Sequence, residues 1–194
     1  MFSFNYSTLI NCAIKCLGTS NSLTVSKDSF IENSSVTIHG CDNLIVIGKD
    51  VYINHLEIII EGNNNSVFIG NGFFVCGNTR LYVVDGSSLR IGDQCMLSDN
   101  IEIRTTDNHG IYDLSSGERI NEEKDINIGN HVWIGMGATV LKGVNIADGC
   151  IVGAKSLITH SIEQENCCVV GDNRIIKHNV CWTMERKERF SRIV

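Results

Sequence analysis

One polar segment, running from Thr105 to Lys124, contains the residues of this chain that first suggest chemistry. It holds the run Asp107-Asn108-His109-Gly110. Histidine ordinarily titrates near neutral pH, so it can take a proton from a weak nucleophile such as a hydroxyl. Asp107 or a backbone carbonyl would fix the second ring nitrogen, and the sequence leaves both open. The same four residues also have the composition of a polar turn.

The residues around this segment follow a repeat that predicts their structure. Every sixth residue after it is aliphatic: Ile128, Ile134, Val140, Ile146, Val152 and Ile158. Upstream, four aliphatic residues are spaced by 22 positions: Val25, Ile47, Ile69 and Ile91. Such periods fit neither a helix nor a simple strand, and they are typical of an all-β parallel β-helix whose coils stack. One coil then takes 22 residues in the first half of the chain and three hexads in the second.

The repeat also predicts where regular structure stops. The surplus residues of the longer coils fall in glycine- and asparagine-rich turns at 62–65 and 85–87. Residues 107–124 break the repeat and are expected to leave the solenoid as a loop, a common place for functional residues. We expect one domain over 1–194, comprising an N-terminal cap at 1–21, a β-helix at 22–180 and a helical tail at 181–194. A helix from Ser7 to Leu17 and another from Thr183 to Arg192 would cover the two ends of the stack.

Composition narrows the class of protein. The formal net charge of −6 disfavours a nucleic-acid partner, because such proteins usually carry a basic excess. The sequence has no long apolar run and no signal-peptide pattern, so we expect no membrane insertion and a cytoplasmic location. Nine cysteines form no CxxC pair and no zinc spacing, which favours a reducing compartment and no metal site.

The hexads and four further motifs resemble the hexapeptide-repeat O-acetyltransferases, which fold as left-handed β-helices. The motifs are Thr106-Asp107-Asn108-His109, Arg119-Ile120-Asn121, Val132-Trp133-Ile134-Gly135 and Val152-Gly153-Ala154-Lys155-Ser156. Their order is similar to that in bacterial capsule acetyltransferases, including those acting on polysialic acid. The left hand is implied only by this resemblance, because crossover connections in general are right-handed.

The resemblance implies transfer of an acetyl group from acetyl-CoA to a hydroxyl of a bacterial cell-surface sugar, capsular and in some cases sialylated. His109 would be the general base, with Asp107 as its candidate partner. Trp133 would lie beside the reacting atoms, with its indole N–H on the thioester carbonyl or its ring against the acceptor. Backbone N–H groups near Gly135 are the other candidates to stabilise the oxyanion.

The resemblance further implies a homotrimer with acetyl-CoA bound between neighbouring subunits. Small residues would let the pantetheine arm approach the backbone: Gly135, Gly137, Ala138, Gly153 and Ala154. Basic residues near the end of the stack would bind the CoA phosphates: Lys155, Arg174 and Lys177. Arg119 and Arg104 are candidates to pair with the carboxylate of an acidic sugar, although Arg119 could instead anchor the loop. The chain departs from the family where it reads Gly171-Asp172-Asn173-Arg174-Ile175 in place of a proline-containing motif.

Three alternatives remain. A carbonic anhydrase also uses a left-handed β-helix, but it needs three convergent histidines, and the spacing of the six histidines here does not favour them. A non-catalytic solenoid scaffold would keep the hexads without needing His109. An N-acetyltransferase acting on a nucleotide amino sugar would use the same donor and fold with a different acceptor.

Overall fold

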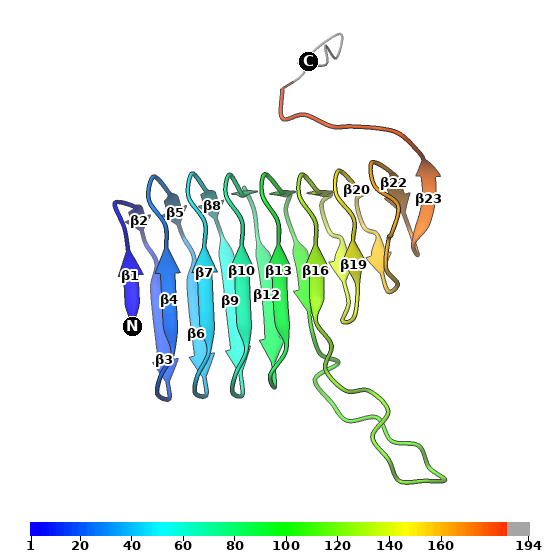
Figure 1. The fold of residues 1–194 in the computed structure, drawn as a ribbon, viewed down its shortest axis with the longest axis horizontal. Coiled ribbons are helices and arrows are strands. Elements are labelled where there is room, and N and C mark those ends of the chain that lie inside the picture. The colour runs from blue at the N-terminus through cyan, green and yellow to red at the C-terminus, as the bar shows by residue number, and fades with distance from the viewer. Residues whose placement is uncertain (186–194) are drawn as a thin grey trace.

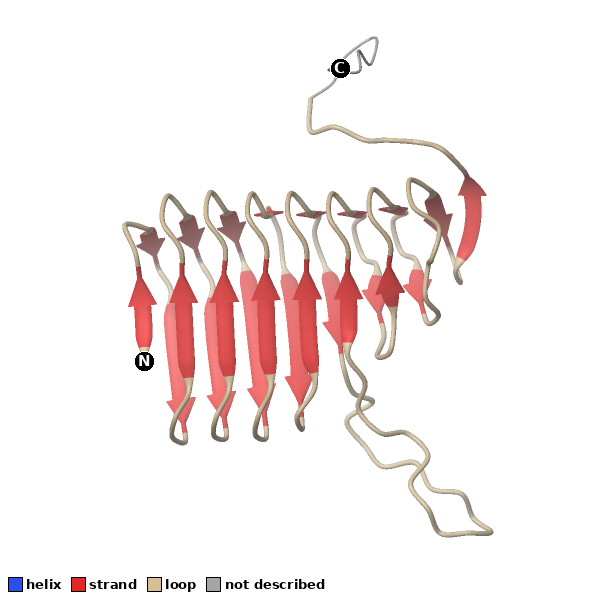
Figure 2. Ribbon diagram, in the orientation of Figure 1, coloured by secondary structure: helices blue, strands red, loops and turns tan. Residues whose placement is uncertain are grey.

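The computed structural model describes residues 1–185, which wind as a three-sided parallel β-helix (Figure 1, Figure 2). In Figure 1 the strands on the near face point up and those on the far face point down, while successive coils advance from left to right. A coil that advances in this sense is left-handed. The fold expected from the repeat and from the family resemblance is therefore confirmed.

Three sheets form the sides of the prism. Sheet A contains β1 (Phe2–Phe4), β4 (Ser22–Val25), β7 (Leu44–Ile47), β10 (Ser66–Ile69), β13 (Ser88–Ile91), β16 (Ile126–Ile128) and β19 (Asn145–Ile146). Sheet B contains β2 (Thr8–Ile10), β5 (Phe30–Glu32), β8 (Tyr52–Asn54), β11 (Phe74–Val75), β14 (Met96–Leu97), β17 (Trp133–Ile134), β20 (Ile151–Val152), β22 (Cys168–Val170) and β23 (Arg174–Lys177). Sheet C contains β3 (Ala13–Leu17), β6 (Ser35–His39), β9 (Leu56–Glu61), β12 (Thr79–Val84), β15 (Ile101–Arg104), β18 (Thr139–Val140) and β21 (Leu157–Ile158).

The aliphatic repeat forms continuous columns inside the prism. One column in sheet A joins the longer and shorter coils in a single register: Val25, Ile47, Ile69, Ile91, Ile128 and Ile146. Each of these side chains is at most 3% exposed. Burying one such side chain contributes roughly 1.5–3 kcal/mol, and no single coil can achieve this burial alone. Stacking of the coils therefore stabilises the fold.

The extra residues of the longer coils form the corner between sheets C and A. Gly62 and Asn64 have φ angles of 84° and 59°, and Asp85 and Gly86 have 50° and 81°. These left-handed conformations explain why glycine, asparagine and aspartate occur there. The expected turns at 62–65 and 85–87 are present in the structure.

The N-terminal helix is not formed. Residues 1–21 make the first coil of the solenoid, and the segment from Ser7 to Leu17 contains β2 and β3. β3 pairs in parallel with β6, so that Cys16 lies opposite Ile38, a residue of the buried core. Pairing with the second coil outweighs the helical spacing of the apolar residues, because β2 extends sheet B and β3 extends sheet C by one strand each. The solenoid therefore begins at the first coil and not at residue 22.

The C-terminal end of the described chain contains an antiparallel strand. β23 turns back along β22, and residues 181–185 continue without helical structure. The rest of the helix expected between Thr183 and Arg192 lies outside the described residues. No helix in the described part of the chain is long and apolar enough to cross a lipid bilayer.

Candidate functional site

The polar segment leaves the prism at one corner and projects below the coils in Figure 1. It begins after β15 ends at Arg104 and returns to the solenoid at Ile126 in β16. Its outer part is an antiparallel hairpin, bridged between Tyr112 and Arg119. The structure thus has a protruding loop where the break in the hexads predicts one.

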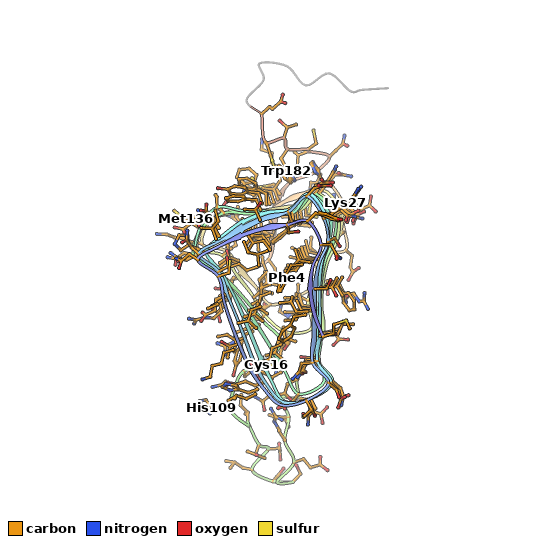
Figure 3. The ribbon with its side chains drawn as sticks, turned by 90° about the vertical axis from the view of Figure 1, so that its left-hand side faces the viewer. Phe4, Cys16, Lys27, His109, Met136 and Trp182 are labelled. Atoms are coloured by element: carbon orange, nitrogen blue, oxygen red, sulfur yellow. The ribbon has the colours of Figure 1, made fainter. Side chains whose placement is uncertain are left out.

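His109 lies on this loop with an exposed side chain, toward the lower side of the end-on view in Figure 3. Its backbone is held from two sides. The carbonyl oxygen of His109 accepts a hydrogen bond from Asn121 Nδ2 at 2.8 Å. The preceding Asn108, with φ of 70°, has its Oδ1 2.9 Å from the Tyr82 hydroxyl on sheet C. The imidazole is therefore open to a ligand while its backbone is fixed.

Tyr82 stays protonated in this contact. Its hydroxyl also lies 2.6 Å from Glu61 Oε2. Burial, followed by the hydrogen bond and charge of Glu61, raises the pKa of Tyr82 to about 12. At neutral pH it is therefore a neutral hydrogen-bonding group and not a second base beside His109.

The Asp107 carboxylate interacts with groups other than the imidazole. Its Oδ2 lies 2.6 Å from Lys142 Nζ and accepts a hydrogen bond from Asn121 Nδ2 at 2.9 Å. The hydrogen bond with Lys142 is the largest influence lowering the pKa of Asp107. Within residues 1–185, no hydrogen bond joins this carboxylate to the His109 ring. The sequence-based expectation that Asp107 orients the imidazole directly therefore receives no support from the geometry.

The two candidate arginines differ in availability. Arg119 Nη2 lies 2.7 Å from Glu123 Oε1, and its Nη1 donates to Glu123 Oε2 at 3.2 Å. Arg104 donates from Nε to the carbonyl oxygen of Thr106 at 3.0 Å, and its guanidinium lies 5.6 Å from the centroid of the Tyr82 ring. Among the described residues, Arg104 has no carboxylate partner. Arg119 thus anchors the loop, whereas Arg104 keeps its charge available to a ligand.

Trp133 points outward from sheet B and is half-buried. Its indole Nε1 donates to Ser98 Oγ on the preceding coil at 3.2 Å. Trp182, from the C-terminal segment, lies against it with ring centroids 6.0 Å apart. Trp182 also stacks on His131 at 4.2 Å and donates from Nε1 to the His131 carbonyl oxygen at 2.7 Å. Trp133 therefore lies in a defined aromatic cluster on sheet B.

His109 and Trp133 are not brought together within one chain. Figure 3 shows His109 at the lower end of the prism cross-section and Trp182, which contacts Trp133, at the upper end. The loop leaves at the corner between sheets C and A, whereas Trp133 belongs to sheet B. A site that uses both residues requires a second copy of the chain.

The small residues expected to line a cofactor groove divide into two groups. Gly137, Gly153 and Ala154 are at least partly exposed near the corner between sheets B and C, whereas Gly135 and Ala138 are buried. Ala138 is fully buried in the core, so its side chain is not available to a cofactor, contrary to expectation. Ala138 belongs to the set of repeat positions whose side chains point into the prism. The family resemblance alone did not distinguish inward from outward positions.

The glycines at this corner have structural reasons for being glycine. A Cβ on Gly135 would lie 2.7 Å from the Ala154 nitrogen, and one on Gly153 would lie 2.7 Å from Val170 Cγ1. Gly137 has φ of 72°. The Gly135 N–H donates to the Val152 carbonyl at 2.8 Å, so it is not free to stabilise an oxyanion.

The basic residues expected at the nucleotide end are exposed. Lys155 lies at the corner between sheets B and C, and Arg174 and Lys177 are the first and last residues of β23. Within residues 1–185, none of the three forms an ion pair. In the same part of the chain, no group of three His, Cys, Asp or Glu side chains is arranged to hold a metal ion.

Sequence reasoning missed several residues that the structure ties to the candidate site, among them Asn121, Lys142 and Trp182. Asn121 belongs to the Arg119-Ile120-Asn121 motif, but its role depends on a loop conformation that the sequence does not specify. Lys142 lies one coil later, and Trp182 reaches Trp133 only because the C-terminal segment turns back across sheet B. Their contacts follow from the three-dimensional fold and have no local signal.

Comparisons with known proteins agree with the fold and the motifs. A family described as bacterial transferase hexapeptide (six repeats) matches residues 125–160. A polysialic acid O-acetyltransferase of Neisseria meningitidis is 51% identical over 67 residues, or 34% of this chain and 31% of that protein. One of Escherichia coli O1:K1 / APEC is 39% identical over 61 residues, or 31% of this chain and 20% of that protein. The matched segments thus span less than a third of these curated relatives.

Solved structures match over nearly the whole chain. The polysialic acid O-acetyltransferase OatWY has a TM-score of 0.77 and 30% identity, covering 98% of this chain and 94% of that chain. The polySia-specific acetyltransferase NeuO has a TM-score of 0.69 and 25% identity, covering 97% of this chain and 92% of that chain. The chain belongs to the hexapeptide-repeat O-acetyltransferase family and, within it, resembles the polysialic acid O-acetyltransferases.

Proposed function

We propose that this protein transfers the acetyl group of acetyl-CoA to a hydroxyl of a bacterial capsular sugar, with His109 as the general base. The observation that carries the proposal is the exposed imidazole of His109 on a fixed backbone, in a chain of the hexapeptide-repeat O-acetyltransferase family. Family membership supports the reaction class, and the loop geometry supports the assignment of the base.

The chemistry needs one proton carrier. A neutral His109 takes the proton of the acceptor hydroxyl while the hydroxyl oxygen forms a bond to the thioester carbonyl carbon. The carbon–sulfur bond of the tetrahedral intermediate then breaks, and the CoA sulfur leaves with the proton returned by the imidazolium. The products are an acetyl ester and CoA thiol, so no other reactant is required.

The site would lie between neighbouring copies of a homotrimer. Support comes from the separation of His109 and Trp133 within one chain (Figure 3). The loop hairpin also exposes apolar side chains that a neighbouring copy would cover: Ile111 (50% exposed), Tyr112 (58%), Leu114 (102%) and Ile120 (64%). A loop of one copy reaching toward sheet B of the next would satisfy both observations.

The donor would lie along the corner between sheets B and C. This edge runs past the side of sheet B that carries Trp133, and Ala154 and Lys155 are exposed on it. Lys155, with Arg174 and Lys177 beyond it, would attract the CoA phosphates despite the acidic total charge. Because the Trp133 N–H already donates to Ser98 Oγ, the ring is the more accessible part of Trp133 for a ligand.

Arg104 would select an acidic acceptor. A hydrogen bond to a charged group contributes about 1.5–3 kcal/mol, so Arg104→Gln is expected to raise KM for a sialylated polymer about 10- to 100-fold. KM for a neutral sugar polymer should change little. Arg119→Gln should instead lower the melting temperature or loosen the loop, because Arg119 is already bound to Glu123.

The experiment that tests the function measures thiol release from acetyl-CoA against a panel of acceptors. The panel contains a sialylated polymer, its monosaccharide, a neutral polymer and a nucleotide amino sugar. Acetyl ester formation on a polymer supports the proposal. Release with the amino sugar alone would establish the N-acetyltransferase alternative, and no release with any acceptor would favour a scaffold.

A further inference from the structure

Three side chains connect the loop to the solenoid beside His109. Lys142 follows β18 on the coil after the loop, and its side chain is only 14% exposed. Its Nζ lies 2.6 Å from Asp107 Oδ2 and donates to the Asn121 carbonyl oxygen at 2.8 Å. One ammonium group of the solenoid thus holds both the entering and the returning arm of the loop.

Asn121 completes the connection from inside the loop. It is 7% exposed, and both the nitrogen and the oxygen of its side-chain amide form hydrogen bonds. Nδ2 donates to Asp107 Oδ2 at 2.9 Å and to the His109 carbonyl oxygen at 2.8 Å. Oδ1 accepts from the Ile111 N–H at 2.7 Å and from Arg119 Nε at 3.3 Å. Asp107 and Ile111, two residues before and two residues after His109, and the His109 carbonyl are therefore connected through Asn121 to Lys142.

We infer that Lys142, Asp107 and Asn121 act as one clamp that positions His109 for catalysis. The inference rests on the proposed function, and it gives Asp107 a positioning role in place of the expected contact with the imidazole. Since the loop leaves the prism, its own hairpin cannot fix His109 relative to the coils. The partly buried contact with Lys142 supplies such a reference, because Lys142 belongs to the stacked part of the chain, and it adds to the hydrogen bond from Tyr82 to Asn108.

Displacement of a catalytic group by about an ångström can reduce turnover by roughly 100-fold without loss of binding. Lys142→Met removes the ammonium group and keeps an apolar side chain of similar length. It is expected to lower kcat about 10- to 100-fold while KM for acetyl-CoA and acceptor stays within about twofold. Lys142→Arg, which retains the charge and the donors, should recover most of kcat. Lys49→Met is the matched control, because Lys49 forms an exposed ion pair with Asp50 at 3.9 Å on a distant coil.

A double-mutant cycle that combines Lys142→Met with Asp107→Asn tests whether these residues act together as a single clamp. The double variant should be no slower than the slower single variant, because the first change already breaks the connection. Two independent and multiplying losses would overturn the inference, and so would an unchanged kcat in Lys142→Met. A rise in KM with kcat unchanged would also overturn it and make Lys142 a substrate-binding residue.

Amide hydrogen exchange tests the clamp without an activity assay. In Lys142→Met, the Ile111 and Lys124 amides, which donate to Asn121 Oδ1 and the Thr105 carbonyl, should exchange faster than in the native chain. Amides of the coils should be unchanged. If His109→Ala keeps full turnover, the proposed base is wrong, and this exchange pattern still decides whether the clamp exists. Unchanged exchange in the loop would show that Lys142 does not hold it.

Discussion

Replacing His109 with alanine is expected to lower the rate of acetyl transfer about 100- to 10,000-fold, the range typical for loss of a positioned general base. The melting temperature should hardly change. The side chain is exposed, and the contacts that hold this part of the loop are made by the His109 backbone and by its neighbours. The measurement is thiol release from acetyl-CoA at saturating acceptor, with kcat and KM determined separately.

Two further variants make this result specific. His109→Gln keeps a polar side chain without a base near neutral pH, and it should be as slow as the alanine variant. His160→Ala replaces another exposed histidine, located after β21 and outside the proposed site, and should keep native turnover. Native turnover in His109→Ala would contradict the role of the imidazole, since its thermal stability would show that the protein had folded.

Ile60→Ala is expected to destabilise the protein by about 2–5 kcal/mol, whereas Ile59→Ala should cost less than about 1 kcal/mol. The two isoleucines are neighbours on β9, but they face opposite sides of sheet C. Ile60 is 0% exposed and lies between Ile38 and Val83 of the adjacent coils. Ile59 points outward and is only partly buried. The difference follows from the alternation of side chains in a strand.

Urea unfolding of the two variants at one protein concentration measures this difference. Equal concentration matters because association of copies adds to apparent stability. The Ile60 variant should show a much lower midpoint, and the Ile59 variant should unfold close to the native protein. Equal losses would mean that the inward column of sheet C does not determine stability as the register predicts.

The sequence predicted the prism because its fold depends on a repeated local pattern. The column from Val25 to Ile146 could be read from spacing alone, including the change from longer to shorter coils. The same reasoning failed for Ser7 to Leu17, where apolar residues spaced as on a helix form β2 and β3. The helical spacing and the solenoid repeat give different predictions only over that short stretch. Pairing with the second coil makes the segment form strands.

The candidate site was less predictable because it depends on contacts between distant residues. The motif around His109 could be recognised from sequence. The partner of Asp107 could not, since Lys142 approaches it only after the chain has left and re-entered the solenoid. Likewise, the charges of Arg104 and Arg119 look equivalent in sequence, and only the position of Glu123 separates them.

We propose that His109 of one copy and Trp133 of the next form a single acetyl-transfer site. Subunit complementation tests it most directly, by refolding together equal amounts of His109→Ala and Trp133→Ala chains that are each inactive alone. Random trimers would place an intact His109 beside an intact Trp133 at about a quarter of the interfaces, so the mixture should recover about a quarter of native turnover. A mixed trimer that forms and stays as inactive as its parents would contradict a site shared between chains.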